Sequence, residues 1–125
     1  MKQLKLFRNK ENKSIVEVVV ENEGFKLCDD YQELKANSTD AAGEKHVPVV
    51  EVAGNTVTVK VGEVAHPMTE EHLINFIILH TEKGFQRADL TATDAPEAVF
   101  ELADGDKAIA AYEYCNLHGL WVKEV

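Results

Sequence analysis

Four of the five histidines in this 125-residue chain stand beside turn residues or at the edges of expected strands, where a hydrophobic core would not place them. They are His46, His66, His72 and His118. The last of them closes a C-x-x-H motif with Cys115, a spacing that brings a thiolate and an imidazole within reach of one ion. Five nitrogen and sulfur donors of this kind suit a transition metal. The types and spacing of these residues therefore indicate a metal site.

Three motifs, taken in order, resemble the signature of the superoxide reductases, the desulfoferrodoxin and neelaredoxin group. They are E-K-H-V-P at 44–48, H-P-M followed by Glu71-His72 at 66–72, and C-N-L-H-G at 115–119. The resemblance covers roughly Ala42 to Lys123. It implies an all-β chain with an immunoglobulin-like β-sandwich, whose loops hold one mononuclear iron that alternates between Fe(II) and Fe(III). The ligands implied are His46, His66, His72 and His118, with Cys115 as the axial thiolate.

The same resemblance implies an activity, the one-electron reduction of superoxide to hydrogen peroxide. Glu44 and Lys45 match the family residues that flank the open iron position, so both are expected to be catalytic. Electrons are expected from a small external donor such as rubredoxin, because the iron returns to Fe(III) after each superoxide. Family members form dimers or tetramers, which predicts a homo-oligomer. The fifth histidine, His80, matches no motif position and is expected to be structural or exposed.

Two non-catalytic metal sites remain as alternatives. A structural zinc site would take Cys115, His118 and two other histidines, and it would leave one histidine and the Glu44-Lys45 pair unexplained. A cupredoxin-like electron-transfer site also lies at the loop ends of a β-sandwich, but it requires a weak axial methionine after the last histidine. The only internal methionine, Met68, precedes Cys115.

Short strands separated by turns are expected to position these residues. Val57, Val59 and Val61 alternate with polar residues in a run that follows a Gly54-Asn55 turn, which predicts a hairpin with the preceding run 47–54. The apolar segment 72–80 fits a helix or a strand, and its isoleucine-rich composition favours a strand. Further strands are expected at 85–90, 98–102, 108–114 and 120–125. This spacing is typical of a β-sandwich.

The N-terminal part reads as a separate appendage. Two β-rich runs around a Glu-Asn-Glu-Gly turn predict a small β-hairpin over 14–28, and the polar segment 29–43 predicts a linker. We place the boundary near Ser38, with residues 1–38 as one region and 39–125 as the iron-binding β-sandwich. The first region resembles the rubredoxin-like, or desulforedoxin-like, domain of two-iron desulfoferrodoxins. It departs from that pattern because Asn9, Asn12 and Asp29 stand where three of four cysteines would be.

A single thiolate cannot hold a tetrathiolate iron, so this region is expected to have kept its hairpin and lost its metal. The remaining cysteine, Cys28, is expected to be a buried thiol. The net charge of −9 argues against nucleic acid and anionic membranes as partners. No apolar run is long enough for a membrane span or a secretory signal, which predicts a cytoplasmic protein.

Overall fold

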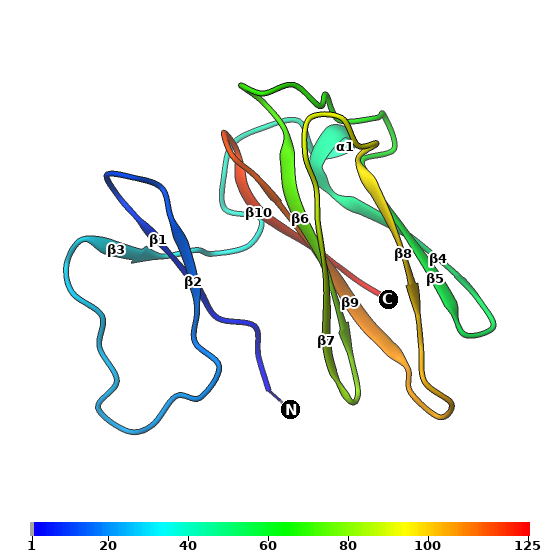
Figure 1. Cartoon of the computed structure of the whole chain (residues 1–125), viewed down its shortest axis with the longest axis horizontal. Helices are drawn as coiled ribbons and strands as arrows, with labels where there is room; N and C mark the ends of the chain where they lie inside the picture. The colour runs from blue at the N-terminus through cyan, green and yellow to red at the C-terminus, as the bar shows by residue number, and fades with distance from the viewer. Residues whose placement is uncertain (1) are drawn as a thin grey trace. The chain divides into compact units, whose positions relative to one another are not determined.

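The computed structural model describes residues 2–125, which form two compact units divided between Lys35 and Ala36. The second unit holds two antiparallel sheets, one with the strand order β10-β9-β6-β7 and one with the order β4-β5-β8 (Figure 1). Its elements are α1 (Gly43–His46), β4 (Pro48–Ala53), β5 (Thr56–Val61), β6 (Ile74–Thr81), β7 (Gly84–Asp89), β8 (Glu97–Glu101), β9 (Ala108–Cys115) and β10 (Gly119–Glu124). The β-sandwich and the positions of its strands confirm the sequence prediction.

The core of this unit lies between the two sheets and follows from alternation along the strands. Val57, Val59 and Val61 of β5 are buried, whereas Lys60 between them is exposed. In register, Val57 lies opposite Phe100 of β8, so the buried side chains of neighbouring strands share one face. The segment 72–80 is a strand as predicted, because β6 pairs with both β7 and β9 and is buried along most of its length.

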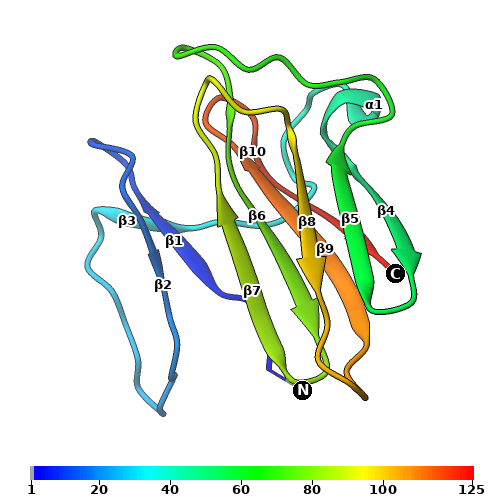
Figure 2. The same cartoon turned by 45° about the vertical axis from the view of Figure 1, so that its right-hand side comes forward.

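Three connecting segments gather at one end of the sandwich. In both views, α1, the loop between β5 and β6, and the turn between β9 and β10 lie at the same end, opposite the β6–β7 hairpin (Figure 2). These are the segments that carry the candidate metal ligands. The sheets thus act as a frame that brings three loops together, although the loops are far apart in the sequence.

The short helix α1 was not expected from the sequence, which indicated a linker over 29–43, the E-K-H-V-P loop at 44–48 and strands from residue 47 onward. It is one turn long, and the Val47 N–H closes it by donating to the Gly43 carbonyl at 2.8 Å. A single turn is too short to produce the periodic pattern that reveals a helix. Its effect is to present Glu44, Lys45 and His46 together at the end of the sandwich.

Gly62 allows α1 to lie against the end of β5. Its φ of +83° is in the left-handed region, and a Cβ atom there would lie 2.7 Å from the Glu44 carbonyl oxygen and 2.5 Å from that of Val64. The Val64 N–H donates to the Glu44 carbonyl at 3.0 Å, which ties the two segments together. Only glycine offers both the conformation and the space that this approach needs.

The first unit contains a three-stranded sheet in the order β2-β1-β3, formed by β1 (Leu6–Asn9), β2 (Ile15–Glu17) and β3 (Tyr31–Glu33). A hairpin is present, but the predicted position over 14–28 is wrong, since β2 pairs with β1 and not with residues 25–28. The reason is the turn between β1 and β2. There Asn9 Oδ1 accepts the N–H groups of Glu11 and Asn12, at 2.9 and 3.0 Å, which folds the chain back early.

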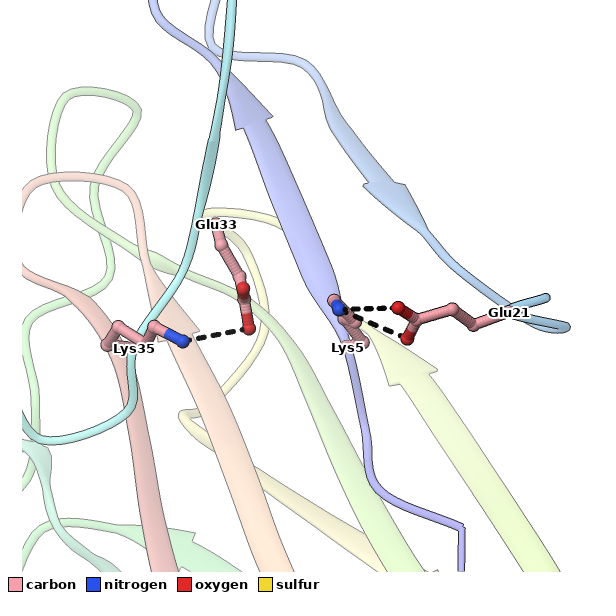
Figure 3. Close-up of polar contacts among 4 residues, drawn as sticks. All are labelled: Lys5, Glu21, Glu33 and Lys35. Carbon is pink, nitrogen blue, oxygen red and sulfur yellow. Dashed lines mark hydrogen bonds and ion pairs between the residues drawn. The ribbon is translucent and has the colours of Figure 1, made fainter. Parts of the chain in front are cut away.

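Two further expectations for this part of the chain are corrected. The predicted linker 29–43 contains strand β3, whose Tyr31 lies opposite Asn9. Cys28 is exposed rather than buried, because it precedes β3 in a polar turn. Two ion pairs on this unit join Lys5 to Glu21 at 3.0 Å and Lys35 to Glu33 at 3.1 Å (Figure 3). None of the helices within residues 2–125 has the length and apolar character to span a membrane.

Replacing Gly62 by alanine is expected to destabilise the fold by more than its conformation alone would cost. A left-handed φ costs an L-residue roughly 1 to 2 kcal/mol, and the contact with two carbonyl oxygens adds about 1 to 3 kcal/mol. Urea unfolding of Gly62→Ala measures the sum. Gly105→Ala is the matched control, because Gly105 has the same φ of +83° and open space around its Cα. Equal losses in the two variants would contradict the close approach at Gly62.

Candidate metal centre

The five residues predicted to bind metal meet at the loop end of the sandwich. One donor atom from each lies within 4.8 Å of the donor atoms of all the others. The set is His46 of α1, His66 and His72 of the loop before β6, Cys115 at the end of β9, and His118 in the turn before β10. All five therefore converge as the family resemblance implied, while His80 lies outside the group.

Two main-chain carbonyls fix the orientation of the first two rings. Nδ1 of His46 lies 2.8 Å from the Ala42 carbonyl oxygen, and Nδ1 of His66 lies 2.7 Å from that of Pro67. A carbonyl oxygen only accepts, so both Nδ1 atoms carry hydrogen and both Nε2 atoms are unprotonated in the neutral rings. These two Nε2 atoms are 3.2 Å apart. Two lone pairs at this distance repel each other, and a cation between them removes the repulsion.

The remaining donors complete the cluster from other sides. Nδ1 of His118 lies 3.1 Å from Nε2 of His46 and 3.9 Å from Sγ of Cys115, while the same sulfur lies 3.4 Å from Nε2 of His66. His72 contributes a buried Nε2 that has no hydrogen-bond partner among the described residues. Buried polar atoms normally have a partner, so a buried imidazole nitrogen without one is typical of a metal ligand whose ion is absent.

Burial keeps the ring nitrogens in the form that binds metal. It lowers the pKa of His66 to about 4, and it lowers the pKa values of His46 and His72 below their ordinary value. Neutral imidazole is the ligating state, so these rings need lose no proton near neutral pH. Burial also raises the pKa of the Cys115 thiol, against the opposing effect of nearby main-chain N–H groups. Metal binding must therefore release the proton of this thiol.

Two side chains hold the ligand loops in place by contacts that the sequence did not indicate. Asn116 donates from Nδ2 to the Glu71 carbonyl and accepts the Leu73 N–H at Oδ1, both at 3.0 Å, and so brackets His72. Met68 accepts the N–H of Ile74 at its sulfur, which anchors the loop to the start of β6. Asn116 lies inside the C-x-x-H motif, so the sequence shows that it is near the ligands. Its hydrogen-bond partners could not be predicted, because they lie 43 and 45 residues away.

Glu44 and Lys45 lie on the exposed side of α1, next to His46. Burial is the main cause of the lowered pKa values of His46 and His72, and the positive charge of Lys45 acts in the same direction. The negative charge of Glu44 has the opposite effect on His46. Glu44 also lines a surface cavity of about 610 Å³ with residues of β4 and β10. The structure thus places both residues beside the cluster, and their catalytic roles stay predictions.

His80 was expected to be structural or exposed, and the structure shows that it is not exposed. It is buried on β6, and its ring stacks on Phe85 with a centroid distance of 4.4 Å. Met68, the methionine that a cupredoxin-like site would need as an axial ligand, lies within a few residues of two ligands, but its sulfur is the acceptor for the Ile74 N–H. The arrangement also exceeds the four ligands of a structural zinc site.

The donor set fits a single iron. Four neutral imidazoles and one thiolate are borderline to soft ligands, which suit iron and other transition metals and do not suit Mg²⁺ or Ca²⁺. The orphaned His72 nitrogen and the facing lone pairs of His46 and His66 both call for a cation at the centre of the group. Fold and site together define the class: a β-sandwich with a mononuclear four-histidine, one-cysteine metal centre at one end.

Comparisons with known proteins agree with this class. The family model for desulfoferrodoxin matches residues 38–124. The chain is 45% identical over 113 residues to a desulfoferrodoxin from Syntrophotalea carbinolica, covering 89% of this chain and 88% of the relative. It is 42% identical over 105 residues to a superoxide reductase from Pyrococcus abyssi, covering 70% and 91%. The chain therefore belongs to the desulfoferrodoxin family.

The similarity extends to solved structures. The crystal structure of the superoxide reductase from Treponema pallidum matches with a TM-score of 0.81 at 40% identity, covering 98% of this chain and all of that one. A one-iron superoxide reductase from Giardia intestinalis matches with a TM-score of 0.58 at 35% identity, covering 66% and 97%.

A buried carboxyl group lies beneath the ligand cluster on the inner face of β9. Glu113 is two residues before Cys115, has no exposed surface, and neither of its carboxyl oxygens has a partner among the described residues. Burial raises its pKa to about 9. In the unfolded chain its pKa is ordinary, so between about pH 4.5 and 9 the folded state of the metal-free protein holds a proton that the unfolded state releases.

Stability of the metal-free protein is therefore expected to gain from Glu113→Gln, increasingly so at higher pH. Because the folded parent binds one proton more than the unfolded parent, its free energy of unfolding falls by about 1.4 kcal/mol for each unit of rising pH. The neutral amide of the variant removes this dependence. Urea unfolding at pH 5, 6, 7 and 8 measures the difference between the two proteins. The exposed Glu97→Gln, which removes one carboxylate from the surface, is the control. A stability difference between Glu113→Gln and the parent that does not change with pH would mean that the Glu113 carboxyl group is already ionised.

Proposed function

We propose that this chain is a superoxide reductase, which converts superoxide, one electron and two protons to hydrogen peroxide. One observation carries the proposal: five nitrogen and sulfur donors converge within 4.8 Å in a chain that matches the Treponema pallidum superoxide reductase over nearly its whole length. Superoxide is the electron acceptor, and an external redox donor supplies the electron.

The residues proposed to hold the iron are His46, His66, His72, His118 and Cys115. The iron would supply one-electron chemistry by cycling between Fe(II) and Fe(III), with a thiolate ligand tuning its potential. Cys115 is fully buried, so its sulfur is shielded from solvent and from competing oxidants. The main-chain N–H groups of Leu117 and His118 stabilise the thiolate form of this sulfur. The carbonyls of Ala42 and Pro67 keep the rings of the two buried histidines oriented.

Lys45 is proposed to attract the anionic substrate. The chain has a net charge of −9, which slows the approach of superoxide, so a local positive charge is needed at the site. Lys45 is exposed, follows directly on Glu44, and acts on the imidazoles of His46 and His72. Arriving superoxide would meet this charge within a Debye length, about 8 Å at physiological ionic strength. The ammonium group and nearby water are also the proposed proton source.

Glu44 is proposed to act after electron transfer. Its carboxylate is a hard oxygen donor of the type that a ferric ion prefers, and it adjoins His46 in the same helical turn. A negative charge at the site while superoxide arrives would oppose binding. Glu44 therefore serves the oxidised state of the cycle, in which it assists the departure of peroxide.

The N-terminal region, residues 1–38, is proposed to be a rubredoxin-like domain without metal. The side-chain oxygen Oδ1 of Asn9 accepts two main-chain N–H groups, and Oδ1 of Asn12 accepts the N–H of Ser14 at 2.9 Å. These two asparagine side chains stabilise the turn by hydrogen bonds, and they supply no thiolate there.

Without a second iron in the chain, the electron must come from another molecule, for which rubredoxin is the proposed type. Both cysteines are free thiols, which suits the reducing cytoplasm, and the proposed assembly is a homodimer or homotetramer.

Metal analysis of the purified protein, with a visible spectrum before and after mild oxidation, tests the proposal. About one iron per chain is expected, together with a thiolate-to-iron charge-transfer band in the oxidised form. Superoxide should then disappear without release of dioxygen. Cys115→Ser is expected to lose both the band and turnover, while the exposed Cys28→Ser is expected to keep both. Zinc without colour would overturn the catalytic proposal, and two irons per chain would overturn the metal-free N-terminal region.

Lys45→Ala is expected to lower the second-order rate with superoxide by about threefold to tenfold at low ionic strength, with the iron spectrum nearly unchanged. Added salt should shrink the difference, because screening weakens the attraction that the lysine provides. Pulse radiolysis at several salt concentrations measures both effects. Lys83→Ala removes the same charge at the β6–β7 hairpin, at the opposite end of the sandwich (Figure 2), and is the control. Equal rates for Lys45→Ala and the parent at low salt would contradict the role.

A further inference from the structure

Trp121 of β10 lies against two of the proposed ligands. Its ring stacks on the imidazole of His46, with a centroid distance of 5.1 Å and an interplanar angle of 24°. It is the only tryptophan in the chain and is 5% exposed. In register, Trp121 lies opposite Glu113 of β9, so its side chain belongs to the same sheet face as Glu113 and Cys115. The indole thus forms part of the wall beneath the metal centre.

The indole also makes a directional contact with the other end of the cluster. Its Nε1–H donates to the main-chain carbonyl of His118 at 3.1 Å. This hydrogen bond holds the turn that carries His118, and the amide of Asn116 anchors the same turn to Glu71 and Leu73. One rigid side chain therefore contacts both His46 and His118, whose facing ring nitrogens are 3.1 Å apart.

These contacts restrict the motions that would misplace the two rings. The hydrogen bond to Ala42 fixes one edge of the His46 ring, and the stacked indole blocks rotation of its face. The bond from the indole to His118 prevents the turn from opening away from the cluster. Holding ligands in place before the ion arrives lowers the entropy cost of binding.

We propose that Trp121 is a positioning residue of the metal centre, which preorganises His46 and His118 for one ion. The inference rests on the proposed function, because that function assigns both histidines as ligands. Partners that lie one shell outside the ligands typically change metal affinity by about 10- to 100-fold when they are replaced. A tryptophan that served packing alone would affect stability and leave the metal affinity and the ligand geometry unchanged.

Two variants separate the parts of this role. Trp121→Phe keeps an aromatic ring that can stack on His46 and removes only the N–H donor to His118. Trp121→Leu removes both the stack and the donor. Phe100→Leu is the matched control, since Phe100 is an aromatic residue of the other sheet with the same 5% exposure, opposite Val57 in the core. It changes the packing of a buried aromatic position in strand β8.

The probe is Co²⁺ added to the metal-free full-length protein, which gives visible ligand-field bands and a thiolate charge-transfer band. Titration gives the affinity, and urea unfolding gives the stability of each variant. Trp121→Phe is expected to weaken Co²⁺ binding by about threefold to tenfold, the effect of one hydrogen bond. Trp121→Leu is expected to weaken it by about tenfold or more and to shift the ligand-field bands. Phe100→Leu is expected to lose stability while keeping the parent affinity and spectrum.

The outcomes distinguish the two proposals. Parent affinity and parent bands in both Trp121 variants would overturn the positioning role and leave the proposed function intact. An affinity loss that Phe100→Leu shares in proportion to lost stability would also overturn it, because packing alone would then explain the effect. If Trp121→Leu does not fold, Trp121→Phe decides. A parent chain that binds no Co²⁺ through Cys115 would overturn the proposed metal centre and the role of Trp121 together.

Discussion

Two hydrogen bonds determine what this end of the molecule can do, those from His46 to the Ala42 carbonyl and from His66 to the Pro67 carbonyl. Each bond places the hydrogen of its ring on the outer nitrogen, which leaves the inner nitrogens as lone-pair donors 3.2 Å apart. In the metal-free protein this contact between two lone pairs is unfavourable. Protonation of one ring would relieve it, but burial disfavours the protonated form. A cation at the centre is the arrangement that satisfies all of these groups at once.

The sandwich supplies the rigidity that such a contact requires. Its core residues on β5, β6 and β9 interlock the two sheets, and the strand ends then fix where each loop begins. Gly62 lets α1 lie close to β5. Met68 attaches the His66 to His72 loop to the start of β6, and Asn116 attaches it to the turn between β9 and β10. Because the donors come from segments up to 72 residues apart, their convergence depends on the whole fold being formed. Metal binding and folding should therefore stabilise each other.

The ligands and the strands could be predicted from the sequence, because both leave local signals. A C-x-x-H motif is visible in four residues, and alternation such as that of Val57 to Val61 identifies a half-buried strand. The hairpin expected over 14–28 failed since the turn is set by Asn9, whose side chain competes with the more apparent Glu-Asn-Glu-Gly turn. The contacts of Trp121 could not be predicted either. They depend on strand register and on a turn that brings His118 back over β10, and the spacing of the residues predicts neither of these.

The two cysteines of this chain differ in their accessibility to reagents. Cys28 is exposed in a polar turn of the first unit, whereas Cys115 is fully buried and burial raises the pKa of its thiol. Alkylating reagents react with thiolates that they can reach, so in the metal-free protein they should modify Cys28 first and spare the ligand sulfur. The exposed thiol is thus an attachment point for a label that leaves the metal centre chemically intact, and a slow second modification would report how often the buried site opens.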